Sequence, residues 1–435
     1  MKIAVAGTGY VGLVTGICLA EHGHEVTCVD VDEEKIAVMQ SGKPPIFEPG
    51  LDELMLKNME RLTYTTDYRS AYAGAKVIFV GVGTPEKRDG SANLSYIYAV
   101  ADQIAESVSE ECVIVIKSTV PIGTNDRVED YLKDALKGRV NIHVASNPEF
   151  LAQGTAVRDT LHASRIVIGV EDPFSEKVLR EVYEGFDAPL IVTNRRSAEM
   201  IKYASNDFLA LKISYINEIA NLCEVIGADI EDVSKGMSYD SRIGSQFLRA
   251  GIGYGGSCFP KDTKALNWLA RFNDHEIKTV KAAIEVNENQ KFLPVKKAAR
   301  YYKDLKGVKV AVLGLTFKPG TDDLREAPSL VTVPVLLDDG AKVRAWDPVG
   351  VENFKKRLEG EVEYCDTIEE TLKDAELCLI FTEWPEVKAI KPETFVQLMK
   401  NPIVIDGRNC FETEEIRGVS GLVYDSIGRA VIDNR

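Results

Sequence analysis

The sequence has no excess of basic residues. Its 435 residues include 52 Lys and Arg against 67 Asp and Glu, giving a formal net charge of −15. Because no surplus of positive side chains is available to neutralise phosphates, a general nucleic-acid binder and a binder of anionic membranes are both excluded. An anionic small ligand would need a local basic pocket.

Paired cysteines are also missing. The chain has eight cysteines but no Cys-x-x-Cys and no spacing typical of a zinc site or a disulfide framework. They stand at positions 18, 28, 112, 223, 258, 365, 378 and 410. We therefore expect no metal, and a reducing cytoplasmic location in which thiols persist.

A membrane-spanning run is absent as well. The segment from Ile3 to Ala20 carries no charge, but glycines at 7, 9, 12 and 16 interrupt it. No small-x-small cleavage site follows, and Glu25 begins another strand-like run. The segment therefore predicts neither a signal peptide nor a membrane span.

Short β-branched runs alternate with helical stretches over the first 170 residues. This alternation predicts a parallel, doubly wound sheet. The expected strands are Lys2 to Ala6, Glu25 to Val29, Val77 to Val82, Val113 to Ser118, Ile142 to Ser146 and Arg165 to Val170.

Helical periodicity replaces this pattern near Ser197. Apolar residues recur at helical spacing from Met200 to Cys223, and no Gly or Pro interrupts them before Gly227. We expect one helix of roughly thirty residues, about 45 Å long, with Gly227 as its C-terminal cap.

The strand-rich pattern returns after residue 305 and repeats the beginning. Lys309 to Leu315 parallels Lys2 to Thr8, and Lys342 to Asp347 parallels Glu25 to Asp30. The turn from Gly314 to Gly320 lacks the full glycine fingerprint, so a second dinucleotide is not expected. The predicted fold class is α/β, with two Rossmann-like doubly wound domains joined by a long central helix, and boundaries at 1–196, 197–300 and 301–435.

A glycine fingerprint follows the first expected strand. Gly7, Gly9 and Gly12 have the Gly-x-Gly-x-x-Gly spacing and open a helix, the context in which this motif binds a dinucleotide. Asp30 ends the next strand, where a carboxylate accepts ribose hydroxyls and repels a 2′-phosphate. The pattern predicts NAD rather than NADP.

A second glycine-rich loop, from Gly251 to Asp262, carries Cys258 beside Lys261 and Asp262. Pro260 suits the first turn of a helix, and a helix N-terminus together with Lys261 favours thiolate. A glycine-rich turn with an inert buried cysteine is the alternative at this point.

Lys202 and Asn206 lie four residues apart on the expected long helix, so they share one face. Lys202 could be an ordinary solvated charge, but its neighbours are apolar. A thiolate at Cys258, a cation that stabilises an oxyanion and a carboxylate at Asp262 that holds a water suit oxidation of an aldehyde through a thiohemiacetal.

These residues belong to a longer series of motifs, and through them the chain resembles the nucleotide-sugar 6-dehydrogenases over essentially its whole length. Eight separated motifs carry the resemblance in order. They are Gly7 to Gly12, Gly83 to Pro85, Ser118 to Pro121, Asn147 to Leu151, Lys202 to Asn206, Gly251 to Asp262, Phe317-Lys318 and Asp406 to Arg408.

The resemblance implies a four-electron oxidation of the C6 alcohol of a UDP-sugar, UDP-glucose in first place, with two NAD reduced in succession. Cys258 would attack the aldehyde. Lys202 and Asn206 would stabilise the oxyanion, Asp262 would assist Lys202 and the water, and Thr119 and Glu149 would hold a water used in proton transfer.

Binding residues follow from the same resemblance. Those for NAD are Gly7, Gly9, Tyr10, Val11, Gly12, Asp30, Lys35, Thr84, Thr119, Lys261 and Arg325. Those for the nucleotide-sugar are Glu149, Phe150, Leu151, Lys202, Asn206, Arg242, Phe247, Leu248, Gly255, Lys318 and Arg408. Arg242 would reach the substrate of a neighbouring subunit, which implies a homodimer or higher oligomer, and domain 301–435 would bind the UDP-sugar.

The chain departs from the family pattern at Gln153, where a second acid is common, and at His162 to Ser164. The rival substrates are GDP-mannose and UDP-N-acetylmannosamine, whose enzymes differ in the cysteine loop or in Asn147 to Leu151. A non-catalytic regulator that binds NAD and a nucleotide-sugar is the alternative from another class. Retention of Cys258, Lys202 and Asp262 argues against it.

Overall fold

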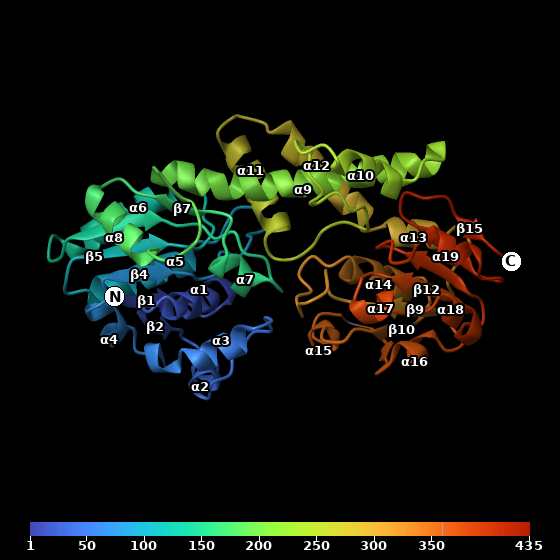
Figure 1. The fold of residues 1–435 in the computed structure, drawn as a ribbon, viewed down its shortest axis with the longest axis horizontal. Helices are drawn as coiled ribbons and strands as arrows, with labels where there is room; N and C mark the ends of the chain where they lie inside the picture. The colour runs from blue at the N-terminus through green and yellow to red at the C-terminus, as the bar shows by residue number, and fades with distance from the viewer. Residues whose placement is uncertain (359) are drawn as a thin grey trace. The chain divides into compact units, whose positions relative to one another are not determined.

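The computed structural model describes residues 1–358 and 360–435. The chain forms two compact units (Figure 1). The N-terminal unit consists of Met1–Ser205 and Trp268–Asn273, and the C-terminal unit of Asn206–Asn267 and Asp274–Arg435. Helix α9 (Arg195–Ile226) begins in the first unit and continues into the second.

The N-terminal unit is built on an eight-stranded sheet of order β3-β2-β1-β4-β5-β6-β7-β8. Its first six strands have the order of a Rossmann fold. The strands are β1 (Lys2–Ala6), β2 (Glu25–Val29), β3 (Leu62–Thr65), β4 (Val77–Val80), β5 (Cys112–Ile116), β6 (Ile142–Ser146), β7 (Ile166–Gly169) and β8 (Leu190–Thr193).

The six strands expected from the sequence are confirmed within two residues at each end. The expectation of a wholly parallel sheet was wrong at one place, because β6 and β7 pair antiparallel through Ser146 and Gly169. Strands β3 and β8 were not predicted. Each has only four residues, and β8 is at most half-buried, so neither gives a strong apolar run.

Helices cover both faces of this sheet (Figure 1). Successive side chains of β1 enter different cores, since Ile3 and Val5 belong to one buried cluster and Ala4 and Ala6 to another. The helices of this part of the chain are α1 (Tyr10–Glu21), α2 (Glu33–Gln40), α3 (Leu51–Lys57), α4 (Tyr68–Ala73), α5 (Ser95–Ser107), α6 (Thr124–Leu136), α7 (Ala156–Leu161) and α8 (Pro173–Val182).

The described residues of the C-terminal unit repeat the plan with a seven-stranded sheet of order β11-β10-β9-β12-β13-β14-β15, and among these strands only the β14–β15 pair is antiparallel. Two Rossmann-like sheets in one chain confirm the expected fold class. The strands are β9 (Lys309–Leu313), β10 (Lys342–Trp346), β11 (Val362–Tyr364), β12 (Leu377–Ile380), β13 (Ile403–Asp406), β14 (Val423–Ser426) and β15 (Ile432–Asp433).

Helix α9 has 32 residues and ends where Gly227 adopts φ +77°, as expected for a glycine cap. The helices that follow α9 are α10 (Ile230–Ser238), α11 (Phe259–Phe272), α12 (Lys278–Gln290), α13 (Leu293–Ala298), α14 (Ser329–Asp338), α15 (Val351–Lys355), α16 (Ile368–Leu372), α17 (Pro385–Lys388), α18 (Glu393–Leu398) and α19 (Thr413–Arg417). They belong mostly to the C-terminal unit, but the end of α11 from Trp268 belongs to the N-terminal unit.

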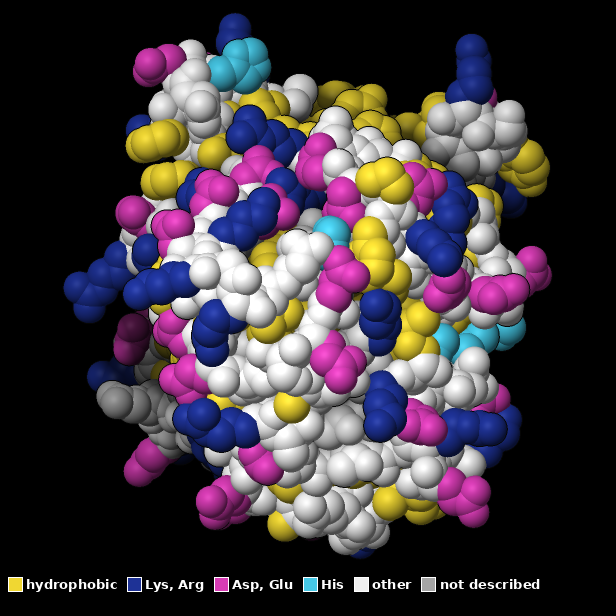
Figure 2. All heavy atoms as spheres, turned by 90° about the vertical axis from the view of Figure 1, so that its left-hand side faces the viewer, with side chains coloured by type: hydrophobic (Ala, Val, Ile, Leu, Met, Phe, Trp, Pro, Cys, Tyr) yellow, Lys and Arg dark blue, Asp and Glu magenta, His cyan; other side chains and the backbone are white. Residues whose placement is uncertain are grey.

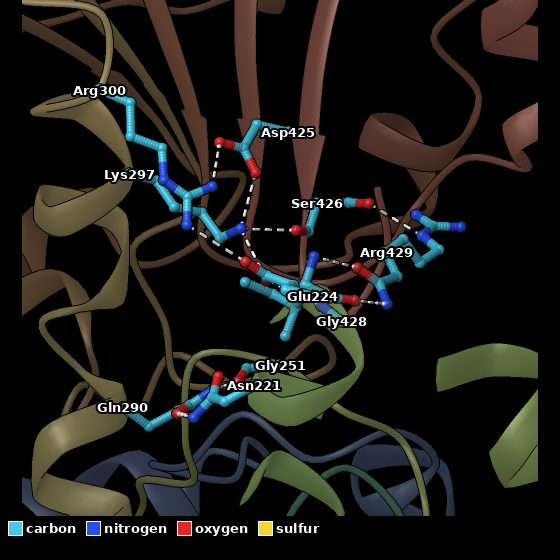
Figure 3. A network of polar contacts seen from close by, with 12 residues as sticks. Asn221, Glu224, Gly251, Gln290, Lys297, Arg300, Asp425, Ser426, Gly428 and Arg429 are labelled. Atoms are coloured by element: carbon cyan, nitrogen blue, oxygen red, sulfur yellow. Dashed lines mark hydrogen bonds and ion pairs between the residues drawn. The ribbon is translucent and has the colours of Figure 1, made fainter. Parts of the chain in front are cut away.

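A buried ionic network fastens α9 and α13 to the end of β14 (Figure 3). Lys297 is completely buried, and its Nζ donates to Asp425 Oδ1 at 2.6 Å, to Glu224 Oε1 at 2.7 Å and to the Ser426 carbonyl at 2.9 Å. Arg300 adds a second cation 3.1 Å from Asp425 Oδ2. All three donor positions of the Lys297 ammonium are therefore satisfied.

Acidic and basic side chains are interspersed on the face shown in Figure 2. That face carries no continuous basic area of the kind that binds nucleic acid. Within residues 1–358 and 360–435, no helix is long and apolar enough to cross a membrane.

Candidate active site

The first glycine turn contains one glycine with a positive φ, one with no room for a side chain and one with open space beside it. Gly7 adopts φ +92°, and a Cβ on Gly12 would lie 2.0 Å from the Gly7 carbonyl oxygen. Gly9 is exposed and has open space where its Cβ would stand. Helix α1 begins just after Gly9 without a side-chain cap, so its first backbone N–H groups remain for an anionic ligand.

Asp30 is held beside this turn. Its Oδ2 accepts from the Thr8 backbone N–H at 2.9 Å and from the Thr8 hydroxyl at 2.5 Å, and its Oδ1 accepts from the Asp32 N–H at 3.1 Å. Burial opposes ionisation of Asp30, but these hydrogen bonds and the charge of Lys35 outweigh it and lower the pKa of the carboxyl. An ionised Asp30 at the end of β2, next to a glycine cradle that a Cβ would fill, fits the ribose and pyrophosphate of NAD.

Two further residues expected to bind NAD meet at the carboxyl ends of β4 and β5. The Thr84 hydroxyl donates to the Thr119 carbonyl at 2.8 Å. Tyr10 donates from its hydroxyl to the Phe47 carbonyl at 2.6 Å. Thr84 and Thr119 therefore lie next to each other in the loops that follow β4 and β5. Tyr10 is bonded to the loop before α3.

Glu149 and Lys202 form a buried ion pair. Lys202 Nζ donates to Glu149 Oε1 at 2.7 Å, and their side chains are 3% and 5% exposed respectively. Glu149 Oε2 accepts from the Leu151 N–H at 2.8 Å. The Phe150 ring lies 5.6 Å from Lys202 Nζ and 3.9 Å from the guanidinium carbon of Arg165. Lys202 is thus a buried cation rather than a solvated one.

The segment after Leu151 is held by a residue that the motifs did not indicate. Glu48, which is buried, accepts from the Gly154 N–H and the Ala156 N–H, each at 2.7 Å. Gln153 has a buried side-chain oxygen with no hydrogen-bond partner among the described residues. The neutral amide therefore takes no part in a polar network through that atom.

Cys258 stands at the start of α11. The Asp262 N–H donates to the Cys258 carbonyl at 2.8 Å, which closes the first turn, and Pro260 is the second helical residue as expected. The Ser257 hydroxyl oxygen lies 3.7 Å from the Cys258 sulfur. Cys258 is partly exposed, unlike the buried Cys18, Cys28 and Cys378.

Asp262 connects this turn to helix α9. Its side chain is 1% exposed, and it accepts from Asn206 Nδ2 at 2.7 Å and from Lys261 Nζ at 2.6 Å. Lys202 lies one helical turn before Asn206 on α9. Lys261, which the sequence assigned to NAD binding, is thus paired with Asp262.

Asp207, next to Asn206, was not predicted from the sequence. It is buried, and neither of its carboxylate oxygens has a hydrogen-bond partner among the described residues. Burial, followed by the charge of Asp262, raises the pKa of Asp207 to about 8, although Lys261 opposes the shift.

Polar side chains from α9 and α12 fix the backbone of the Gly251 to Gly256 loop. Asn217 Oδ1 accepts from the Gly251 N–H at 2.8 Å, and Gln290 Nε2 donates to the Gly251 carbonyl at 2.8 Å. Asn287 bonds the Tyr254 N–H at 2.7 Å and its carbonyl at 3.0 Å. Asn217, Asn287 and Gln290 lie in helices and form no recognisable motif. The sequence therefore did not predict that they hold the loop.

The other face of the loop packs against two predicted sugar-binding segments. Arg408 donates to the Gly253 carbonyl and to the Phe317 carbonyl, each at 3.2 Å. Lys318 Nζ lies 5.6 Å from the centre of the Phe317 ring. A Cβ on Gly255 would lie 2.6 Å from the Glu326 carbonyl oxygen. Leu248 is buried, and Phe247 adopts φ +64°.

Two predicted binding arginines have exposed side chains that pair with nearby aspartates. Arg242 pairs with Asp240 at 2.6 Å, and its side chain is 88% exposed. Arg325 pairs with Asp323 at 2.7 Å, while its carbonyl accepts from the Gly256 N–H at 2.7 Å. No group of three or more His, Cys, Asp or Glu that could hold a metal occurs in the described part of the chain.

Comparison with known proteins covers nearly the whole chain. Profiles of the UDP-glucose/GDP-mannose dehydrogenase family match the NAD binding domain at residues 1–187, the central domain at 196–289 and the UDP binding domain at 311–413. The UDP-glucose 6-dehydrogenase YwqF of Bacillus subtilis (strain 168) is 50% identical over 434 residues, covering 99% of this chain and 98% of YwqF.

More distant relatives agree. UDP-glucose 6-dehydrogenase of Rhizobium meliloti (strain 1021) is 46% identical over 438 residues, covering 99% of this chain and all of that protein. The solved structure of a UDP-glucose dehydrogenase from the archaeon Pyrobaculum islandicum superposes with a TM-score of 0.92 at 36% identity and covers 98% of each chain. The chain therefore belongs to the UDP-glucose/GDP-mannose dehydrogenase family and is an NAD-dependent oxidoreductase.

Proposed function

We propose that this enzyme oxidises the C6 alcohol of UDP-glucose to the carboxylate of UDP-glucuronate, with two NAD reduced for each sugar. The observation that carries the proposal is Cys258 at the start of α11, one turn before an Asp262 that Asn206 and Lys261 both hydrogen-bond. The relatives named UDP-glucose 6-dehydrogenase support the choice of substrate.

The reaction runs in two oxidations on one sugar. NAD, when bound, supplies the acceptor for the hydride that C6 loses in each of them. After the first, the alcohol proton has also left and C6 is an aldehyde. The Cys258 sulfur then bonds to C6, which gives a thiohemiacetal. Loss of the second hydride and of the hydroxyl proton gives a thioester, and water cleaves the C–S bond to release carboxylate and thiol.

The remaining residues take supporting roles in this scheme. Lys202 and Asn206 stabilise the negative oxygen on C6, a function that suits a buried ammonium and an amide N–H. Asp262 assists the hydrolytic water, and Thr119 and Glu149 hold the water that accepts the alcohol proton. The burial of Lys202, Asn206, Asp262 and Glu149 supports these roles, because preorganised charges act most strongly where water is excluded.

Nucleotide and cofactor binding are assigned to separate segments. The NAD residues are those of the first glycine turn and its neighbours, namely Gly7, Gly9, Tyr10, Val11, Gly12, Asp30, Lys35, Thr84 and Thr119, together with Lys261 and Arg325. The UDP-sugar residues are Phe150, Leu151, Phe247, Leu248, Gly255, Lys318 and Arg408. We assign 1–196 to NAD, 197–300 to the central helical domain and 301–435 to the UDP-sugar.

We also propose that two copies associate along α9. Phe208, Tyr215 and Leu222 recur every seven residues on this helix, and all three are at least half-exposed. Such a stripe is typical of a helix that packs against a partner. Arg242, which is exposed and pairs with Asp240, is the residue we assign to the neighbouring subunit's substrate. We assign the enzyme to the cytoplasm, where its eight free thiols stay reduced.

The test measures how many molecules of NADH form for each molecule of UDP-glucose consumed. Purified enzyme is mixed with excess NAD and a limiting amount of UDP-glucose, and NADH is followed by absorbance. Two NADH per sugar and a UDP-glucuronate product support the proposal. One NADH per sugar indicates a simple alcohol dehydrogenase, and none indicates the non-catalytic regulator. GDP-mannose, UDP-galactose and UDP-N-acetylmannosamine, tested in parallel, decide the sugar.

A further inference from the structure

Residues 43–50 lie between α2 and α3, and the proposed mechanism gives them no role. Three of these eight residues are prolines, at positions 44, 45 and 49, and each proline ring fixes one φ angle. Ile46 packs against the buried apolar cluster that contains Val5 of β1. The segment is therefore stiff and seated on the core, so a shift at one of its contacts is passed to the others.

One contact of the segment is with the first glycine turn. Tyr10 follows Gly9 directly and is the first residue of α1. Its hydroxyl donates to the Phe47 carbonyl at 2.6 Å. Because the proposed function places NAD on this turn and assigns Tyr10 to it, bound NAD lies beside a side chain that is hydrogen-bonded to residues 43–50.

The residue after Phe47 makes another contact. Glu48 is 6% exposed, and its two carboxylate oxygens accept from different backbone N–H groups of one loop. Oε2 accepts from Gly154 and Oε1 from Ala156, each at 2.7 Å. A glutamine at this position would offer one acceptor, and its amide nitrogen would face an N–H group. Both oxygens are therefore needed to hold the loop.

That loop begins at Glu149, which holds a water in the proposed function. Carboxylates accept from four of its backbone N–H groups. The Leu151 N–H donates to Glu149 Oε2 at 2.8 Å, and the Ala152 N–H donates to Asp159 Oδ2 at 3.1 Å. Glu48 accepts from the other two. Of these three acceptors, Glu48 is the one that lies outside the loop and α7, so the position of the loop relative to the NAD turn depends on it.

We propose that residues 43–50 couple the NAD turn to the loop that carries Glu149, with Glu48 as the positioning residue. NAD that rests against Tyr10 fixes Phe47 and Glu48, and Glu48 then fixes the loop. The inference rests on the proposed function, which assigns Glu149 and its neighbours to the sugar and to a water. Bound cofactor then tightens UDP-glucose binding, and UDP-glucose tightens cofactor binding by the same factor.

Hydrogen exchange of the loop amides, residues 151–156, tests the coupling without turnover. In wild type we expect saturating NAD to slow this exchange about tenfold, because an ordered loop opens less often. Tyr10→Phe removes only the hydroxyl that bonds Phe47, and Glu48→Gln removes one of the two acceptors. In both variants, saturated with NAD, the slowing is expected to fall below about twofold.

A Glu48 that only stabilises the fold predicts a different pattern. Glu48→Gln would then exchange faster with and without NAD, but Tyr10→Phe would keep the full response to the cofactor. That result overturns the proposal, and so does a wild-type loop whose exchange NAD does not change. If Glu48→Gln does not fold, Tyr10→Phe carries the test by itself.

Matched controls make the same chemical changes elsewhere. Tyr96→Phe alters an exposed residue of α5, and Glu53→Gln alters an exposed residue of α3. Both are expected to keep the wild-type response to NAD. A control that loses the response as Tyr10→Phe does contradicts the inference.

Binding of the sugar gives a second measurement. Calorimetry measures the Kd of UDP-glucose with and without saturating NADH, which occupies the cofactor site without turnover. We expect NADH to lower this Kd about tenfold in wild type and less than about twofold in Tyr10→Phe, in Glu48→Gln and in the double variant, since both changes break one connection. Equal tightening in wild type and Tyr10→Phe refutes the coupling. A wild type that neither binds nor oxidises UDP-glucose, but shows the NAD-dependent exchange, overturns the proposed function alone.

Discussion

Asn206 Nδ2 donates a 2.7 Å hydrogen bond to Asp262 Oδ2, although 56 residues separate the two along the chain. The bond joins helix α9 to the first turn of α11, whose N-terminus carries Cys258. It also fixes the orientation of the amide, because the nitrogen has to face the carboxylate. Asn206 Oδ1 therefore points away from the Asp262 carboxylate, and Nδ2 is the atom that faces it.

Replacement of Asp262 by Asn removes the charge that binds both Asn206 and Lys261. We expect kcat for UDP-glucose to fall by roughly 10² to 10⁴, the range for loss of acid–base assistance, while KM changes less than tenfold. Steady-state kinetics measure both constants. Asp338→Asn, at the exposed end of α14, is the matched control and is expected to keep wild-type kinetics. An unchanged kcat in Asp262→Asn contradicts the role given to Asp262.

Replacement of Cys258 by Ala is expected to affect the two oxidations differently. Thioester formation needs the sulfur, whereas loss of the first hydride does not. A single turnover with limiting UDP-glucose is expected to give at most about one NADH per sugar, against two for wild type. Cys365→Ala, a partly exposed cysteine outside the motifs, is the control. Two NADH at the wild-type rate from Cys258→Ala would exclude the thioester route.

Gly9 and Gly12 allow folding to be separated from cofactor binding. An added Cβ meets a carbonyl oxygen at 2.0 Å on Gly12 but meets nothing within 4 Å on Gly9. We expect Gly12→Ala to lose stability by about 1–3 kcal/mol or more and to lose NAD affinity with it. Gly9→Ala is expected to keep the wild-type melting temperature while its KM for NAD rises about tenfold, because the methyl group faces the pyrophosphate.

The matched control for both glycine variants is Gly74→Ala, which also has open space around the added Cβ. It is expected to keep both the melting temperature and the KM for NAD. The assignment of the turn to NAD fails if Gly9→Ala binds the cofactor as tightly as Gly74→Ala does.

The sequence predicted those candidate site residues whose role depends on their position relative to a single strand or helix. Gly12 and Asp30 were predicted because they follow strands at fixed spacings, and the end of α9 because Gly227 is the first helix breaker. The tertiary contacts of Asn287, Asn147 and Glu48 were not predicted, although Asn147 begins one of the family motifs, since their partners are 33, 30 and 106 residues away respectively. Polar contacts over such separations depend on tertiary packing, which no local pattern specifies.

The antiparallel β6–β7 pair shows the same limit. Alternation of strands and helices predicted that β7 would exist, but its direction depends on how the connection through α7 returns to the sheet. The two short strands β3 and β8 were missed because four residues with few buried positions do not form a distinct apolar run.

Lys297 tests the stability of the C-terminal unit. Its ammonium group is completely buried between Asp425 and Glu224. Lys297→Ala leaves Asp425 buried and short of a partner, and we expect a loss of about 3–5 kcal/mol. Lys296→Ala, one residue away and exposed, is expected to lose less than about 1 kcal/mol. Denaturant unfolding measures both, and similar losses in the two variants contradict the buried network.

Asp207 is expected to make the folded protein less stable as the pH rises from 3.8 to about 8. Its pKa is raised from 3.8 to about 8, chiefly by burial. Below pH 3.8 the side chain is neutral in both states and costs no ionisation energy. Between 3.8 and about 8 the unfolded chain ionises while the folded chain keeps the proton, so stability falls by up to about 1.4 kcal/mol per pH unit. Asp207→Asn removes this dependence.

The stability gain of Asp207→Asn over wild type is therefore expected to grow from pH 5 to pH 8 and to level off above it, as measured by denaturant unfolding at each pH. The absolute difference includes the unbonded amide of the variant, which is a cost that does not vary with pH. Only the change of this stability difference with pH therefore reports the ionisation of the Asp207 carboxyl. Asp338→Asn, whose side chain is exposed, is expected to show no such slope. A pH-independent difference in Asp207→Asn would mean that Asp207 is ionised and hydrogen-bonded in the folded protein, which contradicts its unpartnered oxygens.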